Sequence, residues 1–388
     1  MAIDVIDLPT PDWLADESVS VFADAVQKFF DRECTPHIDT WEAKGEVHRD
    51  LWTTAGSAGL LCAAVSDEFG GAGGDFRHEA IILEALGHYG AEAWGVSLHN
   101  GIVAPYIERY GTKEQKERWL LKLASGEYVG AIAMTEPGTG SDLQGIRTNA
   151  VRQSNKYILN GSKTFITNGQ QADLIIVATK TEKDLGAKGV SLLIVEVPET
   201  EGFRRGRNLD KIGLKGQDTS ELFFDDAAVP VDNLLGGEEG LGFYQLMQEL
   251  PQERLIAAIV GVATMERALD ETTRYVKERK AFGKPVFAFQ NTQFKLAECK
   301  TKVTIAKTFV RSCLKRLLDG NLDAATASMA KYWITDTQCE VIDECLQLFG
   351  GYGYMNEYPI ARLYRDARVQ RIYGGTNEIM KLLIARTL

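Results

Sequence analysis

The sequence predicts a multidomain α+β protein with an N-terminal α-helical domain, a middle antiparallel β-barrel or sandwich, and a C-terminal four-helix bundle. Two changes of periodicity indicate this order. Apolar residues recur at helical spacing up to about residue 125, β-prone runs fill residues 130–237, and helical stripes return after residue 242. A chain of 388 residues suits two or three domains of roughly 150 residues each. We set the domains at residues 1–128, 129–237 and 238–388.

The N-terminal third is expected to be helical. Residues 19–30, 77–89 and 113–124 carry apolar side chains at three- and four-residue spacing, with glycine-rich turns between them. Thr112 followed by Gln115 is the pattern of a capping box, in which each side chain bonds the backbone N–H of the other residue. We therefore expect a helix to begin directly after Thr112.

The middle third is expected to be β-structure. Residues 174–178, 192–197 and 221–224 are short β-prone runs. The pair Asn160-Gly161 separates two further runs, and such a pair favours a tight turn because both residues tolerate positive φ. We therefore predict a hairpin at Asn160-Gly161.

The last third is expected to form long helices. One apolar stripe runs through residues 255–276 and a second through residues 303–317, which is typical of antiparallel helices in a bundle. A third helix is expected over about residues 324–349, and a short fourth helix from Thr376.

Composition and charge exclude several classes of protein. The apolar fraction of 45% and the charged fraction of 25% are those of a folded globular chain. The net charge of −11 disfavours binding to nucleic acid or to anionic lipid. No uncharged run reaches the roughly 20 residues that span a bilayer. The first residues lack the cationic and apolar segments of a leader peptide, so we expect a cytoplasmic protein.

Neither the cysteines nor the histidines indicate a metal site. The six cysteines are dispersed without a CxxC pair, so we expect reduced thiols rather than disulfides or zinc ligands. All five histidines lie in the first 99 residues, and none forms an HExxH motif. Motifs for a Rossmann nucleotide site, a P-loop and a serine hydrolase are also missing.

Three glycine-rich polar segments remain as candidate ligand-binding loops, namely residues 133–142, 347–354 and 371–380. Glycines allow the backbone to approach a ligand closely, and hydroxyl and N–H groups bind phosphates or the edge of a cofactor ring. Thr376 begins a helix whose N-terminal N–H groups favour an anion. On the residues alone, an ordinary turn remains the alternative, and for residues 133–142 it is the favoured one.

Read together, the motifs give a more specific indication. AMTEPGTGSD, GSKTFITNG, ERKAFGKPVFAFQ, QLFGGYGYMNEYPIARLYRDARV and IYGGTNEIM resemble the flavin and substrate segments of the acyl-CoA dehydrogenases. They occur in the family's order and spacing, and the resemblance extends from about residue 10 to the C-terminus. It implies the acyl-CoA dehydrogenase fold, FAD as cofactor, and α,β-dehydrogenation of an acyl-CoA thioester.

The resemblance also implies the cofactor contacts. FAD is expected to be bound within its own subunit by Met134, Thr135, Ser141, Phe165, Thr167, Thr376 and Glu378. The FAD of a neighbouring subunit is expected to contact Arg279, Phe282, Gln290, Gln347, Gly350 and Gly351. An arginine suits a diphosphate, and glycines allow close backbone approach. For Phe165 and Phe282, core packing is the alternative.

The chain departs from the commonest family pattern at the catalytic base. The reaction removes the α-proton of the thioester with a carboxylate, which in many members is a Glu directly after the Tyr of the last motif. Here that position is Gly374, which cannot be a base. The segment LPQERL, residues 250–255, resembles the one that carries the base in the long-chain and isovaleryl-CoA dehydrogenases. The resemblance therefore implies Glu253 as the base.

General chemistry supports a base in this position. A carboxylate facing an apolar acyl pocket has its pKa raised by desolvation and held lower by a neighbouring cation such as Arg254. The alternative is a solvated helix glutamate that pairs with a nearby cation. Glu249, one turn earlier, and Glu378 are lesser candidates for the base.

Gly374 is expected to keep a catalytic role through its backbone N–H, which can bond the thioester carbonyl oxygen. Its missing side chain frees volume beside the α and β carbons of the substrate, which is consistent with long or branched acyl chains. The resemblance to the long-chain branch predicts medium-to-long straight chains first. The expected substrate contacts are Ser141, Tyr244, Arg254 and Tyr373.

The resemblance implies that electrons pass to an electron-transfer flavoprotein and that the chain forms a homotetramer, with a dimer as the alternative. A flavin oxidase or monooxygenase of the same superfamily, which uses oxygen, is a second enzyme hypothesis. A non-enzymatic flavin-bearing relative that binds nucleic acid would need a basic face or extension, which the net charge of −11 disfavours.

Overall fold

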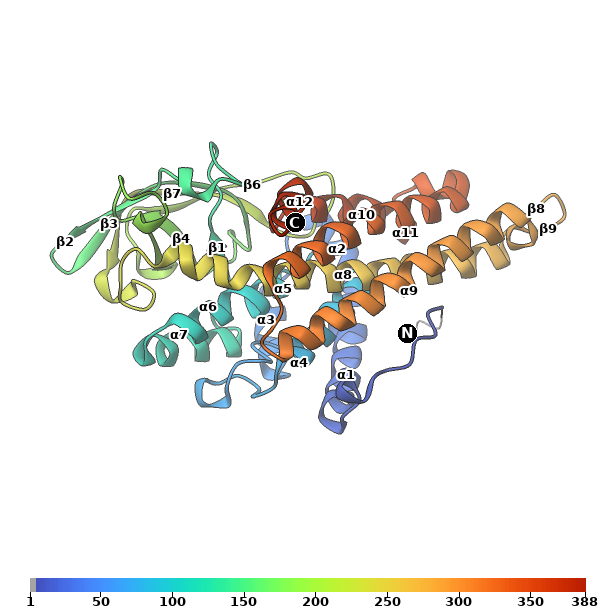
Figure 1. Cartoon of the computed structure of the whole chain (residues 1–388), viewed down its shortest axis with the longest axis horizontal. Coiled ribbons are helices and arrows are strands. Elements are labelled where there is room, and N and C mark those ends of the chain that lie inside the picture. Colours follow the sequence, from blue (N-terminus) through green and yellow to red (C-terminus); the bar gives the residue numbers. More distant parts are fainter. Residues whose placement is uncertain (1–4) are drawn as a thin grey trace.

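The computed structural model describes residues 5–388, with a β-sheet at one end of the molecule and long helices extending from it (Figure 1). The N-terminal part is helical, as expected. The capping box at Thr112 is present, because the backbone N–H of Gln115 lies 3.3 Å from the Thr112 hydroxyl and that of Thr112 lies 3.1 Å from the Gln115 amide oxygen. The helices are α1 (Glu17–Phe29), α2 (Ile38–Lys44), α3 (Asp50–Ser57), α4 (Phe76–Tyr89), α5 (Val96–Leu98), α6 (Ala104–Tyr110) and α7 (Lys113–Ser125).

The middle part is a seven-stranded sheet in the order β1-β4-β2-β3-β7-β6, with β5 paired to β4. Most neighbouring strands are antiparallel, but β1 runs parallel to β4, and a single β2–β4 pair is also parallel. The sheet is therefore mixed, rather than wholly antiparallel as predicted. The strands are β1 (Gly130–Ala133), β2 (Asn149–Gln153), β3 (Lys156–Thr167), β4 (Leu174–Lys180), β5 (Val190–Glu196), β6 (Phe203–Asn208) and β7 (Thr219–Pro230).

The hairpin predicted at Asn160-Gly161 is wrong, because both residues lie inside the continuous strand β3. The register of β3 against β7 shifts between Leu159 and Gly161, so the pair marks a β-bulge. Glycine is required there, since a Cβ on Gly161 would lie 2.4 Å from the Thr148 hydroxyl oxygen. The turn between β2 and β3 instead lies at residues 154–155, where Ser154 has a φ of 54°.

The C-terminal part is a helical bundle around the long helix α8, which lies beside the sheet at one end and reaches the β8–β9 ribbon at the other (Figure 1). Helix α8 packs against α4 and α10, and its stripe through residues 255–276 is buried as predicted. Among residues 5–388, we find no helix with the length and apolar content that a membrane crossing requires. The elements are α8 (Gly242–Glu278), β8 (Lys280–Ala281), β9 (Lys284–Pro285), α9 (Gln290–Leu318), α10 (Ala324–Phe349), α11 (Pro359–Ala367) and α12 (Asn377–Ala385).

Candidate active site

Glu253 is a buried carboxyl group in the N-terminal third of α8. Only 8% of the residue is exposed, which excludes the alternative of a solvated helix glutamate. The Tyr106 hydroxyl, from α6, donates a hydrogen bond of 3.0 Å to Glu253 Oε1. Burial raises the pKa of Glu253 to about 7, while the Tyr106 hydrogen bond and the Arg254 charge act in the opposite direction. The side chain is thus suited to accept a proton near neutral pH.

Glu249 lies one turn before Glu253, but its surroundings are different. It forms an ion pair with Arg109 and accepts a hydrogen bond of 2.7 Å from the Tyr110 hydroxyl. Glu249 is also buried, and burial raises its pKa, but the Arg109 charge and the hydrogen bonds from Arg109 and Tyr110 stabilise its charged form and weaken it as a base. The local geometry therefore favours Glu253 over Glu249 as the base.

The predicted substrate contact Tyr244 is exposed, and it lies close enough to Tyr110 to raise the pKa of the Tyr110 hydroxyl.

Arg254 is buried beside α10, where its Nη1 atom lies 3.3 Å from the Ser328 hydroxyl. Its Nε atom is buried and has no hydrogen-bond partner among the described residues. Burial lowers the pKa of Arg254, while the negative charge of Glu253 raises it. The guanidinium group thus supplies positive charge next to the candidate base.

Gly374 lies in an open turn after the short helical segment Arg368–Arg371. Its φ is 64°, and that of Gly375 is 90°, so both adopt the left-handed conformation that favours glycine. Of the described residues, none has an atom within 4 Å of where a Cβ on Gly374 would lie. Tyr373, the expected substrate contact before it, is 43% exposed as a residue, but its phenol is buried, and this burial raises its pKa. The turn therefore presents backbone and open volume instead of a carboxylate.

A buried ion pair between Glu136 and Lys163 holds the segment that begins with Met134 and Thr135. The Glu136 carboxylate accepts hydrogen bonds from the backbone N–H of Arg147 and Thr148, at 2.7 and 2.9 Å, and from Lys163 Nζ at 3.0 Å. These bonds close the loop from residue 136 to residue 147, which exposes Ser141.

The same segment is joined to β3. Lys163 Nζ donates to the Met134 carbonyl at 2.9 Å, and the backbone N–H of Thr164 donates to the Thr135 carbonyl at 3.0 Å. The second of these bonds joins main chain to main chain, so Met134 and Thr135 lie beside the strand that carries Phe165 and Thr167. Four of the predicted cofactor contacts are thus brought together in this region.

Phe165 is held in an unusual position. It has a φ of 62°, lies in an irregular stretch of β3 and is 68% exposed. Phe282, in the β8–β9 turn, has a φ of 50° and is 95% exposed. These exposures exclude core packing for both rings within the described chain. An aromatic side chain presented on a strained backbone suits contact with a ligand or a partner surface.

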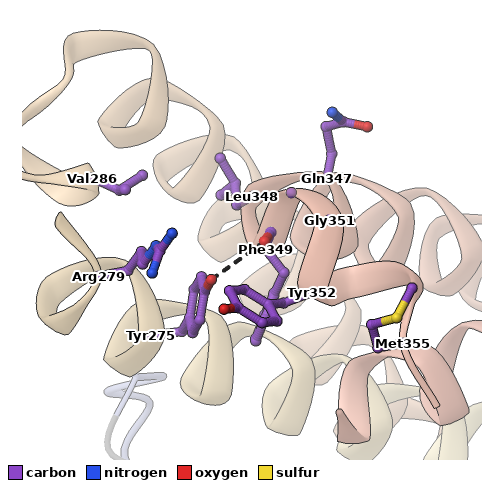
Figure 2. Close-up of a pocket in the computed structure, with 10 residues that line it drawn as sticks. Tyr275, Arg279, Val286, Gln347, Leu348, Phe349, Gly351, Tyr352 and Met355 are labelled. Carbon is purple, nitrogen blue, oxygen red and sulfur yellow. Dashed lines mark hydrogen bonds between the residues drawn. The ribbon is translucent and has the colours of Figure 1, made fainter. Parts of the chain in front are cut away.

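A cavity of about 660 Å³ lies at the far end of the bundle, between the end of α8 and the end of α10. Figure 2 shows Tyr275 and Arg279 facing Phe349 and Tyr352, with the Tyr275 hydroxyl donating a hydrogen bond of 3.3 Å to the Phe349 carbonyl. The cavity is lined by four of the expected FAD contacts, namely Arg279, Gln347, Gly350 and Gly351.

The groups that line this cavity fit the diphosphate part of FAD. The Arg279 guanidinium can pair with a diphosphate, and it also lies 5.4 Å from the centre of the Tyr352 ring. A Cβ on Gly350 or Gly351 would meet nothing within 4 Å among the described residues, so the backbone there is accessible to a ligand.

The remaining predicted cofactor contacts lie on two helices. Gln290 begins α9, in the stretch of chain that follows the β8–β9 ribbon. Thr376 caps α12, and the side chain of Glu378 is exposed in the first turn of the same helix. None of these three residues lines the cavity between α8 and α10.

Sequence reasoning missed two side chains at this site. Tyr106 bonds Glu253 although the two residues are 147 positions apart, and no local pattern marks that contact. Lys331, on α10, donates a hydrogen bond of 2.7 Å to the Gly375 carbonyl. No motif in the sequence singles out this lysine, which lies in a mainly apolar stretch of the helix. The only signal available was a lysine at a position where the helical spacing predicts burial.

Comparisons with known proteins agree with the motifs. Family models described as the N-terminal, middle and C-terminal domains of acyl-CoA dehydrogenase match residues 16–127, 131–227 and 240–388. The mouse protein named long-chain specific acyl-CoA dehydrogenase, mitochondrial, is 52% identical over 95% of this chain and 86% of its own length. The rice protein named isovaleryl-CoA dehydrogenase, mitochondrial, is 35% identical over 97% of this chain and 92% of its own length. The crystal structure of an acyl-CoA dehydrogenase from Geobacillus kaustophilus has a TM-score of 0.95 at 49% identity, covering 97% of this chain and 99% of that one.

Proposed function

The chain belongs to the acyl-CoA dehydrogenase family, and from this premise we propose that it oxidises a medium-to-long straight-chain acyl-CoA to the trans-2-enoyl-CoA with Glu253 as base. The resemblance read from the sequence is confirmed, and so are the fold class and the assignment as an FAD-dependent oxidoreductase of fatty acid metabolism. The observation that carries the proposal is the desolvated Glu253 carboxyl group, whose pKa is raised to about 7.

Glu253 takes the α-proton of the thioester in this proposal. The Tyr106 hydroxyl orients the carboxylate, and burial makes it more basic than a carboxylate in water. The chemistry that bound FAD would supply is acceptance of the β-hydrogen as hydride. The backbone N–H of Gly374 stabilises the negative charge that develops on the thioester carbonyl oxygen.

The cofactor is held by two groups of residues in the proposal. Met134, Thr135, Ser141, Phe165, Thr167, Thr376 and Glu378 bind the FAD of their own subunit. Arg279, Phe282, Gln290, Gln347, Gly350 and Gly351 bind the FAD of a neighbouring subunit. The cavity between α8 and α10, lined by Arg279 and the 347–351 segment, supports the second group. Its position at the end of the bundle suits a site completed by another copy, and we propose a homotetramer, with a dimer as the alternative.

The substrate class follows from the reciprocal change at two positions. Glycine at residue 374 leaves open volume where many family members have a carboxylate, and the base comes from α8 instead. Ser141, Tyr244, Arg254 and Tyr373 are the proposed substrate contacts. The relative named for long-chain acyl-CoA, at 52% identity, supports long straight chains ahead of branched ones. Electron-transfer flavoprotein is the proposed electron acceptor, and the cytoplasm is the proposed location.

The experiment is anaerobic reduction of the FAD-loaded protein with a panel of saturated, branched and aromatic acyl-CoA thioesters. We expect bleaching of the flavin absorption to be fastest with medium-to-long straight chains. The reduced protein is then reoxidised with oxygen or with electron-transfer flavoprotein. Fast reoxidation by oxygen would contradict a dehydrogenase and favour the oxidase hypothesis, whereas the absence of bleaching with every thioester would contradict the substrate class.

A further inference from the structure

We propose that Lys331 is a positioning residue for this reaction. From α10 it holds the turn at residues 374–376, and thereby fixes the backbone N–H of Gly374 toward the thioester carbonyl oxygen. The inference rests on the proposed function, because it concerns the geometry of a group that the proposed reaction uses. Lys331 itself contacts no reacting atom in this account, so its role is to position Gly374.

Packing alone does not fix the turn. Gly374 and Gly375 both have positive φ, at 64° and 90°, and a Cβ on Gly374 would meet no atom of the described residues within 4 Å. The phenol of the neighbouring Tyr373 is buried, but it anchors the chain before the two glycines and not the glycines themselves. Two consecutive glycines lose more backbone entropy on ordering than other residues do. A defined Gly374 N–H direction therefore requires specific bonds to the turn.

Lys331 supplies such bonds. Its Nζ atom donates to the Gly375 carbonyl at 2.7 Å and to the Asn377 side-chain oxygen at 2.9 Å, so it holds the turn on both sides of Thr376. Asn377 is itself anchored to α10, since its Nδ2 atom lies 3.0 Å from the Thr335 hydroxyl and 2.9 Å from Asp336 Oδ1. The turn is thus attached to a single helix by a connected network.

The burial of Lys331 indicates that this network has a purpose beyond packing. The side chain is fully buried, and the two oxygens that it bonds are neutral. Burial and the positive charge of Arg254 lower the pKa of Lys331 to about 8. A cation in such a position is costly, and a methionine of similar length would fill the same volume without that cost.

Helix α10 also connects the turn to the helix of the base. Ser328, one turn before Lys331, lies 3.3 Å from the guanidinium group of Arg254, which directly follows Glu253. Contacts from the same helix therefore reach both the Gly374 turn and the α8 segment that carries the base. Moving the turn relative to α10 would change the distance between the Gly374 N–H and Glu253.

The test is Lys331→Met in the FAD-loaded protein. The limiting rate of flavin reduction at saturating acyl-CoA is measured, together with the red shift in the absorption of a bound aromatic enoyl-CoA, which reports polarisation of the thioester carbonyl. We expect at least about a ten-fold lower rate and a smaller red shift. Lys302→Met, at an exposed α9 lysine that pairs with Glu340 at 2.8 Å, is the control and should match the wild type.

An unchanged rate and red shift in Lys331→Met would overturn the proposal even if the variant unfolds at a lower temperature. If Lys331→Met does not retain FAD, Lys331→Gln is measured in the same way, because glutamine keeps a polar side chain at this buried position but is too short to reach the Gly375 carbonyl. A reduced shift in that variant supports the positioning role, and a wild-type shift contradicts it. A wild-type protein that no acyl-CoA reduces would instead contradict the proposed function itself.

Discussion

Among single residues, the proposed chemistry depends most on the environment of one carboxyl group. Glu253 and Glu249 are both buried, but Glu253 is bonded by Tyr106 and adjacent to the cation of Arg254, whereas Glu249 is ion-paired with Arg109. The residue type of Glu253 could be singled out from its sequence context. Its bond to Tyr106 could not, because a contact across 147 positions leaves no periodic signal.

Tyr106→Phe tests how the base is tuned. The Tyr106 hydroxyl lowers the pKa of Glu253 by bonding the charged carboxylate, so its removal should raise that pKa further above about 7. The base must be deprotonated to act, and the acid limb of the pH profile of flavin reduction should therefore move up by about one pH unit. An acid limb that stays in place would show that the Tyr106 bond does not tune the base.

At the scale of elements, local patterns and long-range pairing differ in how well the sequence predicts them. The capping box at Thr112 and the buried stripe of α8 depend on residues a few positions apart, and both are present. The Asn160-Gly161 turn was predicted wrongly because its local signal is also that of a bulge. The pairing of β3 with β7 decides between a turn and a bulge, and this pairing joins segments that are distant in the sequence.

His99 joins the N-terminal helices to the sheet and gives a prediction at this scale. Its ring accepts from the Gly130 N–H at 3.0 Å and bonds the Leu123 carbonyl at 3.1 Å, which requires the neutral form. Burial lowers the pKa of His99 from 6.5 to about 4. Between these pH values the unfolded chain binds a proton that the folded chain does not, so stability falls as pH falls from 6.5 toward 4.

The expected contribution of His99 is about 3 kcal/mol of unfolding free energy across that pH range. Urea unfolding at pH 7 and at pH 4.5 measures it, as the difference between wild type and His99→Gln. The variant should lose less stability on acidification than the wild type. Equal pH dependence in wild type and His99→Gln would contradict this account.

At the scale of the whole molecule, the sequence predicted the order of helical, β and helical parts, because a change of periodicity is visible without knowing any contact. The sequence did not predict where the candidate ligand-binding segments lie relative to one another. Arg279 and the 347–351 segment meet in one cavity only because α8 and α10 end at the same side of the bundle (Figure 1). Without the family resemblance, these segments would have remained ordinary loops.

Arg279→Met tests the cofactor cavity. Loss of a cation that pairs with a diphosphate should weaken FAD binding by about ten-fold or more. Flavin fluorescence during titration of the apoprotein with FAD measures this, and light scattering checks that the assembly is retained. Arg207→Met, which removes an exposed pair with Glu221 on the sheet, should bind FAD as the wild type does. Equal FAD affinity in Arg279→Met and wild type would exclude the cavity as a diphosphate site.

Removal of the α-proton by Glu253 is the step on which the proposed reaction depends, and Glu253→Gln tests it. Glutamine keeps the size of the side chain and can still bond the Tyr106 hydroxyl, but it cannot accept the proton. Stopped-flow absorption after anaerobic mixing with a long-chain acyl-CoA is the measurement. We expect a yellow, FAD-loaded variant whose flavin is reduced at least about a thousand-fold more slowly than in the wild type. Bleaching at a rate near that of the wild type would contradict it.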